Sequence, residues 1–236
     1  NITAQEDITV SVTTSDLFDA VGGTDYSTLL NQPAVISKGD TSTTVTVNVT
    51  GDSSLELDET FEVVLSDPLF NGVSDSNRVI LGDETGIGTI VNDDAAAISI
   101  DDVSVVEGDG GVANLDFTIS SDVVASRDLD VRVNTADLVD AVGGTDYARI
   151  MAQTAVISAG SMSTTLTVAV IGDTVIETNE TLSVLLSSAR FNGSADPLKV
   201  GFADDTGTGT IIDDDTTSIS IDDVTMSEGN GGFTNF

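Results

Sequence analysis

Carboxylates are the side chains through which this sequence can do chemistry, and they gather in a few short segments. Between residues 95 and 215 they concentrate in Glu107-Gly108-Asp109, in Asp146 of a Gly-Gly-Thr-Asp-Tyr turn, in the segment Asp173–Glu180 and in Asp213-Asp214-Asp215. Carboxylates packed closely together cannot all stay ionised and unpaired near neutral pH, so they bind protons or a cation. An all-oxygen site selects hard ions, above all calcium, which accepts irregular geometry and six to eight ligands.

The rest of the composition excludes several classes of function. Forty acidic residues face seven basic ones, giving a formal net charge of −33. Nucleic acids and anionic membranes both require Lys/Arg patches, so neither is expected as a partner. The chain has no cysteine, histidine or tryptophan and only two tyrosines. It therefore lacks the usual nucleophile–base pairs and the aromatic platforms of a glycoside hydrolase, and we expect no enzymatic activity.

The acidic segments belong to an internal repeat. Gly22–Tyr26 returns as Gly143–Tyr147, and Ile98–Val103 returns as Ile219–Val224, each pair being 121 positions apart without a gap. Such self-similarity indicates an array of like modules. It predicts a complete module at 95–215, a module lacking its first two strands at 1–94, and the first strand and start of the second strand of a third module at 216–236.

Both ends of the chain fall inside the repeat, and its first residue is not methionine. The natural protein is therefore expected to continue in both directions. A first module without two strands would expose apolar sheet and open edges. We expect the tail 216–236 of one chain to complete the first module of another, head to tail.

Alternation of apolar and polar residues predicts strands almost everywhere, with no helical stripe. In the complete module we predict seven, at 97–106, 112–120, 128–135, 154–158, 163–172, 180–188 and 207–213, and the alternation at 44–49 predicts one in the first module. The segment 189–204 is expected to be a long loop. Seven short antiparallel strands predict an all-β, tandem Ig-like β-sandwich. Linkers of about four residues between modules leave little room for free swinging.

On such a sandwich the acidic segments meet at one end of the module. The end of the first strand, carrying Glu107, runs parallel beside the last strand, which ends at Asp213. The turn from Asp173 to Glu180 and the connection bearing Asp146 lie at the same pole. A calcium site at this pole is the prediction. The alternative is that Asp and Gly are simply good turn residues that remain solvated.

Four motifs carry a family resemblance: Val-Val-Glu-Gly-Asp-Gly-Gly at 105–111, Gly-Gly-Thr-Asp-Tyr at 143–147, Val-Ile-Gly-Asp…Glu-Thr-Asn-Glu-Thr at 170–181, and Gly-Thr-Gly-Thr-Ile-Ile-Asp-Asp-Asp at 207–215. Together they resemble the Calx-beta module of sodium/calcium exchangers and large bacterial surface proteins. The resemblance implies a seven-stranded Ig-like sandwich that binds calcium at the acidic pole. The calcium ligands that it implies are Glu107, Asp146, Asp173, Glu177, Glu180, Asp213, Asp214 and Asp215 in the second module, and Asp25, Asp52, Glu56, Glu59, Asp93 and Asp94 in the first.

The sequence departs from the exchanger pattern in two places. Exchangers have consecutive acids where this chain has Gly172-Asp173 and Gly51-Asp52, so one carboxylate is lost in each module. The first module also has Asn92 where the second has Asp213. These differences imply weaker binding or fewer ions than in exchangers.

The leading functional hypothesis is a calcium-stiffened extender of a large secreted or cell-surface adhesin-type protein, resembling bacterial examples. The composition, low in lysine and rich in Thr, Ser, Asp, Gly and Val, favours an extracellular location. The lack of cysteine is compatible with an exported bacterial protein, whereas a small secreted eukaryotic module would more often carry disulfides. Neighbouring modules, and other cell-surface or matrix proteins, are the expected partners. An ion at the pole could bridge to Asp101 and Asp102 of the next module, unless these are plain solvated strand-edge residues.

Two other functions remain open. The first is a regulatory calcium sensor within a membrane protein. The second is ligand binding, for example of a sugar, through loops such as Phe191-Asn192-Gly193. An Asn-Gly turn anchored by a buried Phe explains that loop equally well.

Overall fold

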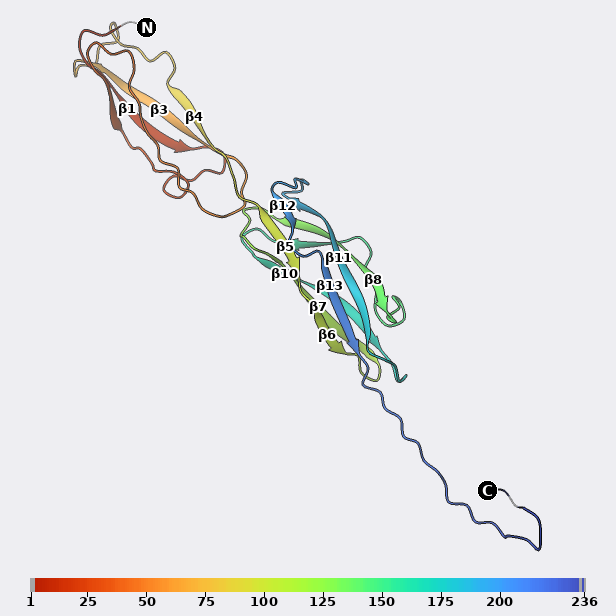
Figure 1. The fold of residues 1–236 in the computed structure, drawn as a ribbon. Coiled ribbons are helices and arrows are strands. Elements are labelled where there is room, and N and C mark those ends of the chain that lie inside the picture. Colours follow the sequence, from red (N-terminus) through yellow and green to blue (C-terminus); the bar gives the residue numbers. More distant parts are fainter. Residues whose placement is uncertain (1–2, 234, 236) are drawn as a thin grey trace.

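The computed structural model describes residues 3–233 and 235, and within them every regular element is a β-strand (Figure 1). The first module holds β1 (Ile8–Asp16), β2 (Gln32–Ile36), β3 (Glu59–Phe70) and β4 (Thr85–Ile90). The second holds β5 (Ala96–Ile100), β6 (Val103–Val106), β7 (Gly111–Ser121), β8 (Leu129–Val139), β9 (Gln153–Ile157), β10 (Ser163–Gly172), β11 (Glu180–Phe191), β12 (Val200–Phe202) and β13 (Thr206–Ile212). The described residues include no helix that could cross a membrane.

The second module is a sandwich of two sheets. One has the order β10-β7-β5-β12 and the other the order β6-β13-β11-β8-β9. Alternate residues of each strand face inward, as in Leu115, Phe117 and Ile119 of β7, all at most 1% exposed. These side chains belong to a single core cluster. The predicted all-β, Ig-like sandwich is confirmed.

Two details differ from the predicted strands of this module. The first strand, expected as 97–106, is split: β5 joins the four-stranded sheet, and β6 crosses over to pair in parallel with β13. Asp101 and Asp102 lie at the crossing. The expected loop 189–204 also contains the short strand β12, which pairs in parallel with β5. Both features help to close the sandwich along one edge.

The first module forms a single sheet with the order β2-β1-β3-β4, equivalent to β9-β8-β11-β13 of the second. The strand expected at 44–49 is absent from the structure: the segment makes only an isolated bridge, between Val49 and Tyr26. Its counterpart β10 pairs along its whole length with β7. Among the described residues nothing occupies the place of β7 in the first module, and an alternating sequence without a partner forms no ladder.

The tail after β13 makes no strand in its described part, although its sequence repeats that of β5. It leaves the second module at the end opposite to the first module (Figure 1). Ile219 and Ile221, whose counterparts Ile98 and Ile100 are buried, are each 96% exposed.

The two modules touch beyond the short link between β4 and β5. Leu55, from a turn of the first module, is fully buried in the core cluster of the second, beside Ala125. Its amide donates to the carbonyl of Val124, and its carbonyl accepts from the amide of Ser126, both at 2.9 Å. The junction is therefore held by apolar packing and by backbone hydrogen bonds.

Candidate metal centre

The acidic pole of the second module begins where two parallel strands end. β6 and β13 run side by side to their last residues, so Glu107 and Asp213 leave the sheet together. The Glu107 amide donates to the carbonyl of Ile212 at 3.1 Å. The Gly108 amide donates to Oδ1 of Asp214 at 3.0 Å. These hydrogen bonds hold the two acidic segments against each other, as predicted.

Three carboxylates converge within this pole. Oxygens of Glu107, Asp213 and Asp215 all lie within 4.8 Å of one another. Glu107 is buried, and the two aspartates are half-buried. Oδ2 of Asp215 is buried and has no hydrogen-bond partner in the described part of the chain. An orphaned, buried carboxylate oxygen is costly unless a cation satisfies it.

A second group of carboxylates surrounds Glu180, the first residue of β11. Glu180 is only 7% exposed, and its Oε2 is buried without a partner among the described residues. Asp146, equally buried, and the exposed Glu177 contribute the neighbouring charges. The turn that carries Asp146 is fixed by the Tyr147 hydroxyl, which donates to Oδ1 of Asp137 at 2.6 Å.

The electrostatics of the pole reflect this crowding. Burial raises the pKa of Glu107 to about 7, and the nearby charges of Asp173 and Glu177 raise it further. Burial also raises the pKa of Glu180 to about 7, with Asp146 as the next cause. These shifts have the sign expected of carboxylates that lack a positive partner.

Two predicted ligands of this module, Asp173 and, from the group of three, Asp213, also have structural roles. Oδ1 of Asp173 accepts from the Val175 amide at 2.7 Å, and Oδ1 of Asp213 accepts from the Glu177 amide at 3.2 Å. Each of these two carboxylates fixes the loop with one oxygen and has a second oxygen for a cation. Asp214 is exposed and lies outside the group of three.

Two hollows make up the acidic pole of the first module. One, of about 100 Å³, is lined by Asp52, Glu56, Glu59, Asn92, Asp93 and Asp94, among others. The other, of about 250 Å³, has walls from both modules and includes Asp19, Asp25, Glu56, Glu59, Ser126 and Arg127. Glu59 is 6% exposed. The pKa of Glu59 is raised to about 7, mainly by burial and next by the negative charges of Asp25 and Glu56.

Asn92 changes the chemistry of this first pole. Its Oδ1 accepts from the Glu56 amide at 2.9 Å, as Asp213 does in the second module, and its Nδ2 donates to the carbonyl of Asp94 at 2.8 Å. The loop geometry is thus kept without the charge. No described residue of the first module takes the place of Glu107. The first pole therefore has fewer carboxylates than the second.

Basic residues of the second module reach into this first pole. Nη2 of Arg127 lies 2.8 Å from both carboxylate oxygens of Asp19. Nζ of Lys199 lies 3.8 Å from Oδ1 of Asp58 and donates to the carbonyl of Glu56 at 3.5 Å. Two of the chain's seven basic residues are thus committed to the junction, beside the predicted ligands.

Sequence reasoning missed one acid at each pole. Asp19 adds to the raised pKa of Glu59, which burial mainly causes, and its repeat counterpart Asp140 acts in the same way on the buried Glu180. The signal was present, because the two residues are 121 positions apart just before each Gly-Gly turn.

Asp101 and Asp102 lie within the second module, not at its junction with the first. Oδ1 of Asp101 accepts from the Thr118 amide at 2.7 Å, and Oδ1 of Asp102 accepts from the Thr208 amide at 2.6 Å. These bonds fix the crossing between β5 and β6. The role as plain strand-edge residues is therefore the one that the geometry favours.

Gly172 explains one departure from the exchanger pattern. A Cβ at this position would collide with the carbonyl oxygens of Gly108 and Glu107. An acid cannot replace it without moving the Glu107 turn. The counterpart Gly51 has no atom within 4 Å of such a Cβ.

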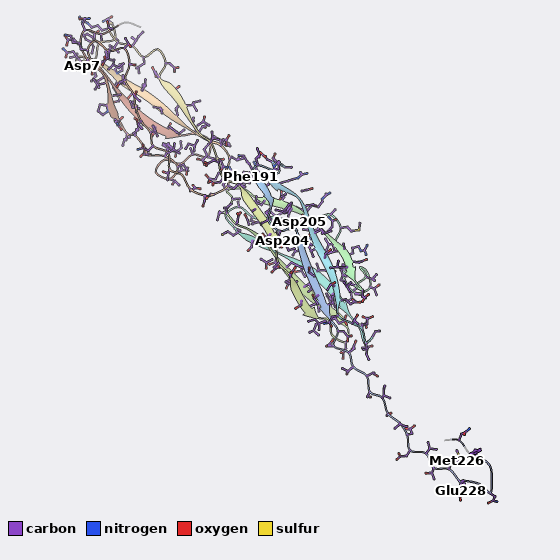
Figure 2. The ribbon with its side chains drawn as sticks, viewed as in Figure 1. Asp7, Phe191, Asp204, Asp205, Met226 and Glu228 are labelled. Carbon is purple, nitrogen blue, oxygen red and sulfur yellow. The ribbon has the colours of Figure 1, made fainter. Side chains whose placement is uncertain are left out.

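The Phe191 loop is a tight hairpin turn. Asn192 and Gly193 both have positive φ, at 50° and 74°, and the amides of Phe191 and Ser194 each donate to the other residue's carbonyl at 3.0 and 2.9 Å. The Phe191 ring is 3% exposed, and Figure 2 labels it near the junction end of the second module. This is the structural alternative foreseen for the loop.

Comparison with known proteins identifies the family of this chain. The Calx-beta domain model matches residues 1–95 and 92–215. Among solved structures, the apo-form Calx CBD1 domain is 20% identical with a TM-score of 0.43, and the match covers 52% of this chain and all of that chain. CBD12 from CALX1.2 is 15% identical with a TM-score of 0.41, covering 89% of this chain and 90% of that one.

A third structure, the calcium binding domain CBD12 of CALX1.1, is 16% identical with a TM-score of 0.36, covering 87% of each chain. The search of curated proteins found no match. The family model covers both modules and nearly the whole chain, with only the tail outside it. The chain therefore belongs to the Calx-beta domain family.

Proposed function

We propose that this chain is a calcium-responsive tandem module, in which calcium bound at the acidic poles sets how firmly neighbouring modules are held. The observation that carries the proposal is the pair of buried, unpartnered oxygens of Glu180 and Asp215, the second of which belongs to the group of three converging carboxylates. No described residue donates a hydrogen bond to these two oxygens, and a divalent cation would satisfy them. An all-oxygen donor set without histidine or cysteine favours calcium over zinc or copper.

The residues divide into two groups at the second pole. Glu107, Asp213 and Asp215 would hold one ion, with Asp173 next to them. Glu180, Asp146, Glu177 and Asp140 surround a second position. Bound calcium would offset the negative charge that these carboxylates concentrate at the second pole. The hydrogen bonds from Val175, Glu177 and Gly108 would keep the loops in place as the ion enters.

The junction supports a role in regulation. Asp19 faces the carboxylates of the first pole and also receives the Arg127 side chain from the second module. An ion at the first pole would bind Asp19 and so compete with Arg127 for this carboxylate. The junction would then have two arrangements of different stability, one with Asp19 bound to Arg127 and one with Asp19 bound to the ion. A module whose inter-module contact depends on calcium can report calcium to its neighbours.

The second candidate is the extender of a secreted or cell-surface, adhesin-type protein. The short link and the buried Leu55 favour it, because they already restrict bending. The two roles predict different affinities. Cytosolic calcium sensors work at a Kd of about 10⁻⁷ to 10⁻⁵ M, whereas extracellular modules work at about 10⁻⁴ to 10⁻³ M.

Isothermal titration calorimetry of the full chain with calcium tests the proposal. We expect saturable binding that is weakened at least tenfold at the second pole by Asp215→Asn. Asp205→Asn is the matched control, because it removes the same charge just before β13, at the opposite end of that strand (Figure 2). Absence of binding heat and of any change in melting up to about 10 mM calcium, above the weakest extracellular sites, would overturn the proposal.

A further inference from the structure

Two arginines of the second module have no ion-pair partner in the described part of the chain, and they lie together. The chain has seven basic residues against forty acidic ones. Five of the seven form an ion pair: Lys38, Arg78, Arg127, Arg149 and Lys199. The other two, Arg132 and Arg190, line one hollow of about 230 Å³, which we call the arginine hollow. Two unpaired guanidinium groups thus concentrate positive charge at one place on a very acidic protein.

The sheet directs these side chains away from the core. β9, β8 and β11 are neighbours in the five-stranded sheet. Arg132 of β8 pairs in register with Thr154 of β9, and Arg190 of β11 pairs with Asp130 of β8. Arg132 and Asp130 stand on either side of Val131, which is 1% exposed, so they point to the outer face of the sandwich. The arginine hollow is therefore open to solvent and to a ligand.

A β-bulge in β11 shapes the arginine hollow. Between Ser187 and Arg190, three positions along β11 match only two along β8. Ser188, inside this segment, has a positive φ of 53° and joins the lining of the hollow. Bulges bend a strand, re-aim its side chains and are common next to active sites. The lining thus combines two guanidinium groups, the hydroxyls of Thr154 and Ser188, and the carboxylate of Asp130.

The first module keeps the bulge but not the charges. Its register shifts at the equivalent place in β3, where Asp67 has a positive φ of 47°. Ser11 and Leu69 stand in the positions of Arg132 and Arg190. The bulge therefore belongs to the backbone that both modules share, whereas the pair of arginines is particular to the second module.

The lining groups define the chemistry of a ligand that fits. A guanidinium group donates hydrogen bonds in a planar fork that matches the oxygens of a carboxylate, sulfate or phosphate. The side chains of Thr154, Ser188 and Asp130 can exchange hydrogen bonds with hydroxyl groups. No aromatic ring is among the described residues that line the arginine hollow, so stacking does not contribute. An acid that also carries hydroxyl groups satisfies both kinds of side chain.

The net charge of −33 limits the size of this ligand. The chain repels a polyanion over about 10 Å at 0.1 M salt and over longer distances at lower salt, whereas a single negative charge meets much less repulsion. The volume of the arginine hollow is also below the roughly 300–1,000 Å³ of pockets for drug-sized molecules. Charge and volume together favour a compact ligand with one acidic group.

We propose that the arginine hollow binds a small sugar acid. Its carboxylate lies between the guanidinium groups of Arg132 and Arg190, and its hydroxyl groups bond to the other polar side chains of the lining. Glu180, at the acidic pole, is the first residue of β11, and Arg190 is the last but one, about 30 Å farther along the strand. Binding of the sugar acid is therefore independent of calcium, and the two proposals can fail separately.

Titration of the full chain with sodium glucuronate in EDTA, followed by NMR of the arginine Nε–H signals, tests the proposal. The chain has five arginines, and we expect two of their signals to shift. These two signals are identified by their loss in Arg132→Gln and in Arg190→Gln. The Kd should be on the order of 1 mM, as for a ligand of this size. Glucose, which lacks the carboxylate, and acetate, which lacks the hydroxyl groups, should bind at least about tenfold more weakly.

The variants locate the binding. Arg132→Gln and Arg190→Gln should each weaken it at least about tenfold, because a hydrogen bond to a charged group is lost. Arg78→Gln is the matched control, since it removes the same charge from an exposed arginine that already pairs with Asp75 in the first module, and it should leave the affinity unchanged. Ser188→Asp introduces the acid that the first module carries on the same backbone, and its charge should also weaken binding.

Four results would overturn the inference. The first is no shift of the two arginine signals at about 10 mM glucuronate, ten times the expected Kd. The second is binding that survives the combined replacement of Arg132 and Arg190 by Gln. The third is sulfate binding as strong as that of glucuronate, because the hydroxyl groups would then play no part. The fourth is a mass in sedimentation velocity that rises with concentration only while both arginines are present, which would assign the arginine hollow to a carboxylate of a second copy.

Discussion

Nη2 of Arg127, in the second module, lies 2.8 Å from both carboxylate oxygens of Asp19, in the first. This ion pair spans the junction at the point where the first acidic pole faces the second module. Glu59, the buried carboxylate of that pole, has its pKa raised by burial and, to a smaller extent, by the charge of Asp19. The same aspartate therefore belongs both to the contact between modules and to the candidate calcium site.

Replacing Arg127 with Gln should loosen the junction without calcium and strengthen calcium binding at the first pole. Both side chains are about two-fifths exposed or less, and such pairs contribute up to about 1 kcal/mol. The gain in affinity should therefore be no more than about fivefold. Calorimetry gives the affinity, and small-angle X-ray scattering without calcium gives the range of module orientations. Weaker calcium binding in the variant would contradict the competition between Arg127 and the ion.

Leu55 provides a second test of the junction. It is fully buried in the core of the second module, and truncation of a buried leucine to alanine costs about 2–5 kcal/mol. We expect Leu55→Ala to increase proteolysis at the link and to broaden the scattering envelope. Ile176, its counterpart in the second module, is 51% exposed and serves as the control. Ile176→Ala should change neither observable.

The stability of the calcium-free protein should fall as pH rises from about 5 to about 8. Glu59, Glu107 and Glu180 have folded pKa values of about 7, above the ordinary value of 4.5, mainly because they are buried. The folded state therefore keeps protons that the unfolded state has lost. Its extra stability is fully present below pH 4.5 and disappears as pH passes 7. Melting curves in EDTA across this range measure the effect.

Calcium should reverse that trend. Above pH 7 the carboxylates are ionised and available to the ion, so added calcium should raise the melting temperature most at the upper end of the range. At the lower end protons compete and the increase should be small. A rise of equal size at pH 5 and pH 8 would mean that the ion binds elsewhere.

Glu180→Gln separates the two roles of this buried carboxylate. The neutral amide removes a charge that burial and Asp146 disfavour. The variant should therefore be more stable than the unchanged protein in EDTA at pH 8. Its free energy of unfolding should be larger by about 1–3 kcal/mol, and its melting temperature should be higher. The variant should also lose the part of the calcium stabilisation that comes from the position around Glu180. Glu177→Gln, at an exposed position of the same turn, should show a smaller effect in both conditions.

Much of the fold could be predicted from local pattern. Alternation along segments such as 163–172 indicates a strand, and the repeat transfers each assignment from one module to the other. The strand predicted at 44–49 is absent for a physical reason. Alternation describes which face of a strand is apolar, but a ladder needs a neighbour. The neighbour of 44–49 would be the counterpart of β7, and the repeat itself places that counterpart outside residues 1–94.

The sequence pattern also predicts only part of the acidic poles. The parallel ends of β6 and β13 could be inferred from the topology of the sandwich, and with them the meeting of Glu107 and Asp213. The repeat marks Asp19 and Asp140 as a matched pair of acids, but their place beside Glu59 and Glu180 depends on how the Gly-Gly turns fold back toward β3 and β11. The reach of Arg127 across the junction could not be predicted, since no local pattern records contacts between modules.

The parallel pairing of β6 with β13 also has a mechanical meaning. The chain enters the second module through β5, continues into β6 and leaves through β13, and β6 and β13 lie side by side and point the same way. Tension applied to the two ends pulls these strands in opposite directions along their length. The hydrogen bonds between Val103–Val106 and Gly209–Ile212 are then loaded together in shear. They must break together, so this ladder makes the module resistant to stretching from its two ends.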